Sequence, residues 1–214
     1  MFVPVRKMFF TSTVFKLDWQ LHLRIFPSRV SRLRQYFAFD LKTLAHLLDL
    51  RLNKIETLYD LSFSGLNDLA SLHLDLNEIM TIRQGAFRGL SGLIYLYLSD
   101  NNIQYLEPGC FDGLESLSYL HMNNNQLRSL PMAVFRPITG LYDLQLQDNQ
   151  ISEWKLGYFR ENSRVRMLNL NNNEIETIPD YGFYGLEGLI TLEMQNNSLN
   201  AFSPAFNRKK QIKL

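Results

Sequence analysis

The segment Leu69-Ala-Ser-Leu72-His-Leu74-Asp-Leu-Asn77-Glu-Ile79 decides the fold, because the spacing of its apolar residues and its asparagine recurs along the chain. Apolar residues recur in the same register in residues 93–103 and 141–151. Asparagine recurs at a constant interval, without insertion or deletion, at Asn53, Asn77, Asn101, Asn125, Asn149, Asn173 and Asn197. Repetition at one constant period predicts a solenoid in which each repeat is one structural unit.

Each position of the repeat has a predictable physical role. Alternate residues of a short strand face opposite sides, so Leu72 and Leu74 should enter the core while His73 faces solvent. The asparagine follows the strand, and its amide can donate to and accept from backbone groups that a turn leaves unpaired. Stacked repeats should continue these bonds as a ladder. A phenylalanine column should fill the opposite wall of the core, at Phe63, Phe87, Phe111, Phe135, Phe159 and Phe183.

The full pattern, L-x-x-L-x-L-x-x-N-x-I/L-x-x-L-x-x-x-x-F-x-x-L, resembles the leucine-rich repeat of the 24-residue typical subclass. Slit proteins, Toll-like receptors and small leucine-rich proteoglycans contain this repeat, and the resemblance covers residues 45–212. The resemblance implies an α/β solenoid, a horseshoe with a concave parallel sheet and a convex side of short 3₁₀ or irregular segments. It also implies that ligands bind on the concave sheet.

Charge divides the chain into three parts. Residues 1–42 hold eight Lys/Arg against two acids, and we expect a degenerate first repeat or a targeting segment there. Residues 43–199 contain the seven repeats and hold ten Lys/Arg against nineteen acids. Residues 200–214 hold four Lys/Arg and no acid, and we interpret them as a truncated last repeat. An acidic repeat array disfavours nucleic acid as the partner; the simpler interpretation is that the acids keep an elongated domain soluble.

The sequence also predicts which chemistry is absent. Its longest apolar stretch, residues 8–15, is far shorter than the roughly 18 residues of a membrane span. The single cysteine, Cys110, excludes an intramolecular disulfide and a multi-cysteine zinc site, and is interpreted as a small buried thiol. His73 and His121 should lie two strands apart, about 10 Å, which is too far to share a metal ion. Nucleophile, metalloprotease and phosphate-loop motifs are missing, so we expect neither a cofactor nor catalysis.

The exposed strand positions predict a binding site instead. Tyrosine offers a large contact area at low entropic cost, although it also suits exposed strands for its β propensity alone. The predicted ligand-binding residues of the concave face are His73, Tyr95, Tyr97, Tyr119, His121, Asp143 and Asn169. The predicted acidic rim consists of Asp49, Asp75, Asp100, Asp148 and Glu193. Acids opposed only by Arg51 favour a protein ligand with a basic surface.

The sequence therefore predicts a non-catalytic protein-recognition module, as a piece of an extracellular or cell-surface receptor or matrix protein. Asn196-Asn197-Ser198 is an N-glycosylation acceptor pattern that would suit this location. Two alternatives stay open. The missing cysteine-rich caps would suit a cytoplasmic adaptor, and exposed solenoid ends would suit end-to-end or homo-oligomeric assembly of a structural matrix component.

Overall fold

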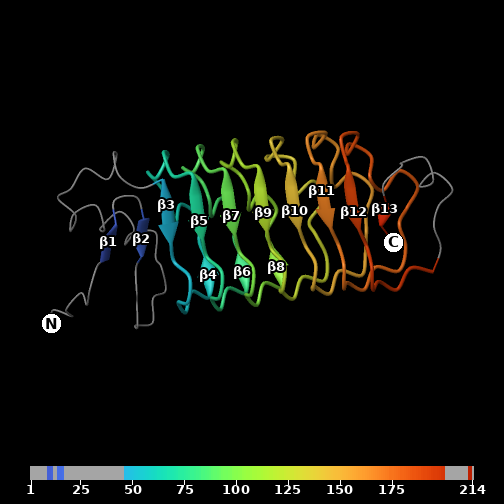
Figure 1. The fold of residues 1–214 in the computed structure, drawn as a ribbon, viewed down its shortest axis with the longest axis horizontal. Helices are drawn as coiled ribbons and strands as arrows, with labels where there is room; N and C mark the ends of the chain where they lie inside the picture. Colours follow the sequence, from blue (N-terminus) through green and yellow to red (C-terminus); the bar gives the residue numbers. More distant parts are fainter. Residues whose placement is uncertain (1–8, 12–13, 17–45, 201–211, 214) are drawn as a thin grey trace.

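The computed structural model of the protein describes residues 9–11, 14–16, 46–200 and 212–213. Each turn of the solenoid adds one strand to a growing sheet (Figure 1). In sheet order, the ten strands are β1 (Phe9–Thr11), β2 (Val14–Lys16), β3 (Leu47–Asp49), β5 (Ser71–His73), β7 (Tyr95–Tyr97), β9 (Tyr119–His121), β10 (Asp143–Gln145), β11 (Met167–Asn169), β12 (Thr191–Glu193) and β13 (Ile212–Lys213). A second sheet contains β4 (Thr57–Leu58), β6 (Thr81–Ile82) and β8 (Tyr105–Leu106).

The strand register reproduces the period of the sequence. From β3 to β12 every neighbouring pair is parallel and joins residues one repeat apart, as in Leu48 opposite Leu72 and Leu144 opposite Leu168. The middle residue of each of these strands points into the core, and Leu72 is fully buried. This register confirms the predicted parallel-sheet solenoid. β1 pairs with β2 in antiparallel fashion, and β2 runs parallel to β3.

The other side of the solenoid is built from turns. Residues 46–200 contain neither an α-helix nor a 3₁₀-helix, so the convex side is of the irregular kind that the repeat allows. The short second sheet forms where the chain runs on after Asn53, Asn77 and Asn101. Within the described segments, no helix has the length and apolar character needed to cross a membrane.

Most of the two end segments lies outside the described residues. This holds for the expected degenerate repeat or targeting segment in residues 1–42, of which only β1 and β2 are described. It holds equally for the expected truncated repeat in residues 200–214, of which Asn200 and β13 are described.

The recurring asparagines form a continuous hydrogen-bond ladder. Asn125 Nδ2 donates to the carbonyl of Leu98, 27 residues earlier, at 3.0 Å, and to that of Met122 at 3.1 Å. Its Oδ1 accepts the amide of Ile103 at 2.9 Å. The carbonyl of Met122 also accepts Asn149 of the next repeat, so one carbonyl links two successive asparagines. Carbonyls shared in this way belong to Leu50, Leu74, Leu98, Met122, Leu146 and Leu170.

Stacked phenylalanine rings form the opposite wall of the core. Consecutive rings from Phe63 to Phe159 lie 5.0 to 6.4 Å apart between centroids and are close to parallel. The geometry is that of offset aromatic pairs, which stabilise beyond the area they bury. Cys110 lies beside this column and is fully buried, and burial raises the pKa of its thiol to about 12. The thiol is therefore protonated at neutral pH and unsuited to nucleophilic chemistry.

One repeat departs from the regular core. Trp154 occupies a column that elsewhere in residues 46–200 holds leucine or isoleucine, and its indole N–H donates to the carbonyl of Gly182 at 3.1 Å. Tyr158 packs edge-on against it and donates its hydroxyl to the carbonyl of Leu130 at 3.2 Å. Both rings are buried with their polar atoms paired. Glycine fits at position 182 because a Cβ there would lie 2.8 Å from the side chain of Ile178.

Asn162 is a second departure, and its polar group is only partly satisfied. It is fully buried in a column whose other members in residues 46–200 are Leu66, Leu90, Leu114, Ile138 and Leu186. Its Nδ2 donates to the carbonyls of Phe135 and Ile138, each at 3.0 Å. Its Oδ1 is buried and accepts no hydrogen bond from the described residues. An amide in this column costs stability that leucine would not.

Asn125→Leu should lower the free energy of unfolding by about 1–3 kcal/mol, since the side chains are close in size but the buried amide of Ile103 loses the oxygen to which it donates. Chemical denaturation monitored by circular dichroism would measure the change. A loss below about 1 kcal/mol would show that the ladder contributes little.

Asn162→Leu, the same substitution in the same fold, should act in the opposite direction. The carbonyls of Phe135 and Ile138 keep their backbone donors, the amides of Ile138 and Leu141, both at 3.1 Å. The variant removes the unpaired oxygen and adds buried apolar area, so we expect a gain of about 1–2 kcal/mol. Denaturation beside Asn125→Leu would test the contrast, and a destabilised Asn162→Leu would contradict it.

Candidate ligand-binding face

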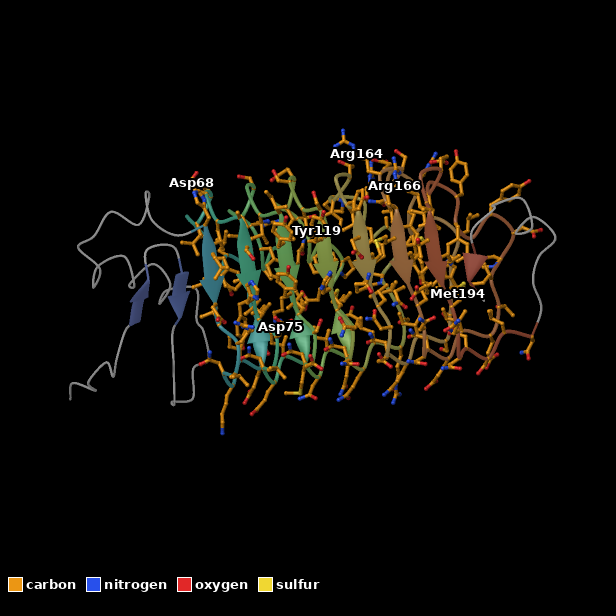
Figure 2. The ribbon with its side chains drawn as sticks, viewed as in Figure 1. Asp68, Asp75, Tyr119, Arg164, Arg166 and Met194 are labelled. Atoms are coloured by element: carbon orange, nitrogen blue, oxygen red, sulfur yellow. The ribbon has the colours of Figure 1, made fainter. Side chains whose placement is uncertain are left out.

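Aromatic side chains form one connected group on the solvent-facing side of the ten-stranded main sheet, which we call the open face. The register places Tyr95 opposite Tyr119 and Tyr97 opposite His121 on neighbouring strands. Tyr95 and Tyr119 stack with centroids 4.7 Å apart, and Tyr97 meets His121 edge-on at 5.0 Å. His73 stacks on the other side of Tyr97 at 4.4 Å. Figure 2 shows Tyr119 on β9, in the middle of the sheet.

The sequence analysis missed one member of this group. Tyr142 lies 6.0 Å from Tyr119 between ring centroids and is exposed, but it precedes strand β10 by one residue. Tyr142 therefore lies outside the strand positions on which the predicted site was based. Its column also contains the exposed Ile94, a signal that was available in the sequence. We define the aromatic ladder as His73, Tyr95, Tyr97, Tyr119, His121 and Tyr142.

Cross-strand contacts explain why these rings are ordered. Facing side chains on parallel strands roughly 4.7–4.9 Å apart stabilise each other when both are aromatic. Tyr95 and Tyr97, which both belong to β7, also lie nearly parallel at 6.5 Å. A ligand would therefore meet a surface that is already formed.

The predicted acidic rim contains one acid that is already neutralised. Asp49 is buried, and Arg51 holds it with Nε at 3.0 Å from Oδ1 and Nη2 at 2.9 Å from Oδ2. Burial alone would raise the pKa of Asp49, but the hydrogen bonds and charge of Arg51 outweigh it and lower that pKa. This pair offers little net charge to a ligand.

Asp75 is only partly accessible. It accepts the amide of Ser99 at 3.0 Å, and its Oδ2 lies 3.9 Å from His73 Nδ1. Burial is the main cause that raises the pKa of Asp75. In Figure 2 this carboxylate lies beyond the ends of the strands, away from Tyr119.

Asp100 and Asp148 lie in the turns that follow the strands. Both adopt left-handed backbone conformations, with φ of 55° and 58°. Their Oδ1 atoms accept the side-chain amides of Asn124 at 2.8 Å and Asn172 at 2.7 Å, one repeat further on. Asn196 extends this turn column, and its Nδ2 donates to Asn172 Oδ1 at 2.8 Å. The candidate glycosylation residue is therefore exposed but already engaged at the end of a row of polar side chains.

The remaining predicted residues form an amide and acid region over β10 to β12. Asp143 accepts a hydrogen bond from Gln145, and Glu193 accepts one from Asn171 at 3.1 Å. Asn169 accepts the amide of Asn171 at 3.0 Å. The open face is thus aromatic over β5 to β9 and, apart from the exposed Met167, polar with negative charge over β10 to β12.

Metal binding finds no support in the described residues. Their His, Cys, Asp and Glu side chains form no group of three that could hold an ion. His73 and His121 lie on β5 and β9, with β7 and the ring of Tyr97 between them.

Both histidines of the aromatic ladder favour the neutral form. Burial lowers the pKa of His73, with the nearby Arg51 adding to the effect and Asp49 opposing it. Burial also lowers the pKa of His121, against the opposing charge of Asp143. Ser71 Oγ lies 3.1 Å from His73 Nε2, whereas His121 Nε2 is buried without a hydrogen-bond partner in the described part of the chain.

Comparison with known proteins places the repeat in a family. Residues 68–127 and 139–205, together more than half of the chain, match the leucine rich repeat family. No curated protein matches the sequence.

Solved structures share the fold. TLR13, in its crystal structure as the TLR13-ssRNA13 complex, aligns with 72% of this chain at 32% identity and a TM-score of 0.68. Drosophila Toll, in the structure of the Toll–Spatzle complex, aligns with 75% at 24% identity and a TM-score of 0.69. The alignments cover 23% and 22% of those two chains, so this chain spans less than a quarter of either.

Acidification should destabilise the folded state. Because folding lowers the pKa of His73 and His121 below the unfolded value of about 6.5, the unfolded chain binds more protons as pH falls through that value. The free energy of unfolding should then decrease from pH about 7.5 to pH about 5.5. The raised pKa of Asp75 acts in the opposite direction, at pH values above its unfolded pKa of about 4.

Urea denaturation across this pH range would measure the slope. His73→Gln/His121→Gln should flatten it, while His46→Gln, at an exposed histidine outside the ladder, provides the matched control. An unchanged slope in the double variant would contradict the assignment.

Proposed function

Because this chain belongs to the leucine rich repeat family, we propose that it is a non-catalytic recognition module that binds a protein ligand on the open face of its sheet. The observation that carries this proposal is the aromatic ladder, in which six rings on neighbouring repeats form one connected group. Tyrosine is over-represented among residues whose truncation strongly weakens an interface. A cluster in contact is a stronger signal than the same number of scattered rings.

The scaffold favours tight binding without conformational change. Strand register, the asparagine ladder and the phenylalanine column fix the backbone beneath the rings. Ordering side chains at an interface opposes association, so rings that are already stacked cost less to immobilise. A pre-formed face of this kind is suited to recognition.

Charge on the face favours a basic ligand. Asp143 lies opposite Tyr119 on the next strand, and Glu193 lies two strands beyond it. Strands β3 to β12 contain no lysine or arginine, and Arg51, just after β3, is paired with Asp49. An arginine of the ligand could stack on a tyrosine ring and reach Asp143 at the same time. Such complementarity acts mainly on association rate and specificity.

We propose that this recognition takes place outside the cell or at its surface, in line with the similarity to TLR13. Expression in secreting cells, with N-glycosidase treatment of the medium, tests this. Secreted protein with a mobility shift, absent in Ser198→Ala, supports the proposal. Retained protein without a shift would favour the cytoplasmic adaptor.

Single-stranded RNA is the second candidate ligand, because TLR13 was solved as the TLR13-ssRNA13 complex. Bases could stack on the tyrosines. Binding of a phosphate backbone depends on lysine and arginine. Strands β3 to β12 contain neither, and the acids of the open face would repel the phosphates. Fluorescence anisotropy with a labelled single-stranded RNA should therefore show no binding at physiological salt, and saturable binding lost in Tyr97→Ala would reverse the ranking.

Tyr97→Ala and Tyr119→Ala should each weaken protein binding by at least about 1 kcal/mol, or about fivefold, because each removes a central ring of the ladder. Ligands from a panel of purified secreted and cell-surface proteins would be measured by biolayer interferometry. Tyr105→Ala, at an exposed tyrosine on β8 in the second sheet, is the matched control. Equal affinity of folded Tyr97→Ala and Tyr105→Ala would refute the proposed face.

A further inference from the structure

On the other side of the solenoid, side chains of one repeat lie over the turn of the next. In three repeats, a side chain of one column lies over a glycine of the next repeat. That glycine is one repeat and one residue further along the chain. Gln84 Cγ lies 3.4 Å from the position that a Cβ on Gly109 would take, and Met132 Sδ lies 3.6 Å from that of Gly157. Asp60 Oδ1 contacts the corresponding position of Gly85.

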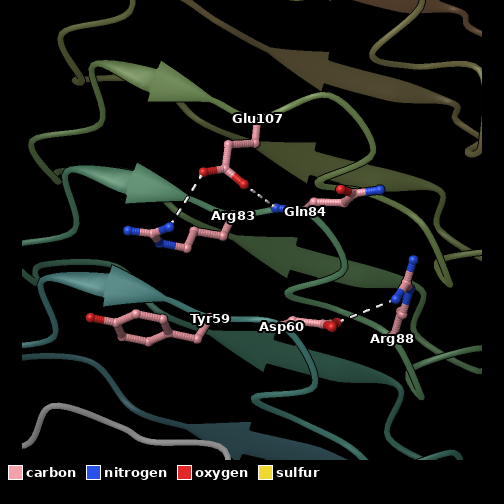
Figure 3. Close-up of a pocket in the computed structure, with 6 residues that line it drawn as sticks. All are labelled: Tyr59, Asp60, Arg83, Gln84, Arg88 and Glu107. Carbon is pink, nitrogen blue, oxygen red and sulfur yellow. Dashed lines mark hydrogen bonds and ion pairs between the residues drawn. The ribbon is translucent and has the colours of Figure 1, made fainter.

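In the first repeats, this surface satisfies its own charges. Arg88 lies between two carboxylates, 3.5 Å from Asp60 and 4.0 Å from Asp112. Arg83 lies 3.7 Å from Glu107 and also stands above an aromatic ring, that of Tyr59, at 5.5 Å. A shallow hollow of about 440 Å³ is bordered by Tyr59, Asp60, Arg83, Gln84, Arg88 and Glu107 (Figure 3). The cations here have partners within the chain.

In the later repeats the arginine remains, but its partners are replaced. Arg160 shares the column of Arg88, and the two positions that hold carboxylates around Arg88 hold Met132 and Tyr184 around Arg160. No carboxylate of the described residues forms an ion pair with Arg160, which is exposed. Among the described residues, the guanidinium therefore has no ion-pair partner.

Exposed apolar side chains lie in the same set of turns as this arginine. Met132, Leu156 and Tyr181 are 59%, 53% and 71% exposed. Met132 and Leu156 share one column, and Tyr181 shares the column of Gly157, over which Met132 lies. We call Met132, Leu156 and Tyr181 the apolar turn patch. Contiguous exposed apolar groups, unlike scattered ones, indicate an interaction site.

We propose that the apolar turn patch docks a second polypeptide, one that presents an apolar side chain to Leu156 and a carboxylate to Arg160. Two other cations nearby are already paired, Lys155 with Glu153 at 2.8 Å and Arg136 with Glu161 at 3.4 Å. Arg160 is thus the cation with which a partner's carboxylate would pair, in the way that Asp60 and Asp112 pair with Arg88. Arginine suits this role because its guanidinium binds carboxylates in a bidentate manner.

The local charge favours a polypeptide over a membrane surface. Glu153, Glu161 and Asp180 lie in the same turns, and anionic headgroups attract clusters of uncompensated Lys and Arg rather than mixed charge. The site is also separate from the open face, because it uses the turns and not the strands.

Selection of short random peptides displayed on phage, against the whole chain, tests the proposal. Selected peptides should be enriched in large apolar residues together with Asp or Glu. Their affinity, measured with synthetic copies, should fall at least about tenfold in Leu156→Ser and in Arg160→Glu. Met80→Ser, at an exposed methionine elsewhere, and Arg164→Glu are the matched controls, and Figure 2 shows Arg164 at the edge of the molecule above the strands.

Folding of every variant would be checked by thermal denaturation. Peptide binding that is retained in Tyr97→Ala/Tyr119→Ala but lost in Arg160→Glu supports the patch. This result does not depend on whether the open face binds a protein ligand. Peptides without acidic residues, or equal binding to Leu156→Ser and Met80→Ser, would overturn it. Sedimentation with phosphatidylserine vesicles lost in Leu156→Ser would assign the patch to lipid instead, and concentration-dependent dimerisation lost in the same variant would assign it to a second copy.

Discussion

The asparagine ladder is the interaction on which the rest of the structure depends. A strand that turns sharply leaves carbonyl and amide groups unpaired in the core, and their burial would otherwise oppose folding. Asn125 satisfies groups in its own repeat and in the one before, and it shares the carbonyl of Met122 with Asn149. Each repeat therefore completes the hydrogen bonding of its neighbour. This mutual dependence fixes the length of the repeat, because an insertion would separate the shared carbonyl from one of its two donors.

A fixed repeat length turns sequence columns into surfaces. Tyr95 and Tyr119 meet because they occupy the same position of successive repeats on neighbouring strands. The same relation sets Arg160 in the column of Arg88 while the carboxylates around it are replaced. The core imposes the geometry, and the exposed positions are free to vary within it. Function can therefore differ between two faces of one solenoid without a change in the fold.

The period, the parallel sheet and the main-sheet strands from β3 to β12 could be predicted, because they follow from buried columns that repeat without slippage. The pairing of Asp49 with Arg51 could not, because it depends on how one flexible side chain folds back along the sheet. Tyr142 was missed, since a residue just before a strand can still lean onto the neighbouring ring. The short second sheet was also unforeseen, because its segments carry no alternating pattern of their own.

The two candidate surfaces differ in chemistry and can act together. The open face combines stacked rings with negative charge, and its strands from β3 to β12 carry no arginine. The apolar turn patch presents exposed apolar side chains in the same turns as Arg160, which pairs with no carboxylate of the described residues. A ligand suited to one is therefore poorly suited to the other, which limits competition between partners. Because strands and turns occupy different sides of the same repeats, a ligand on the strands leaves the turns accessible. A rigid solenoid with two dissimilar faces is thereby suited to hold two partners at a fixed separation.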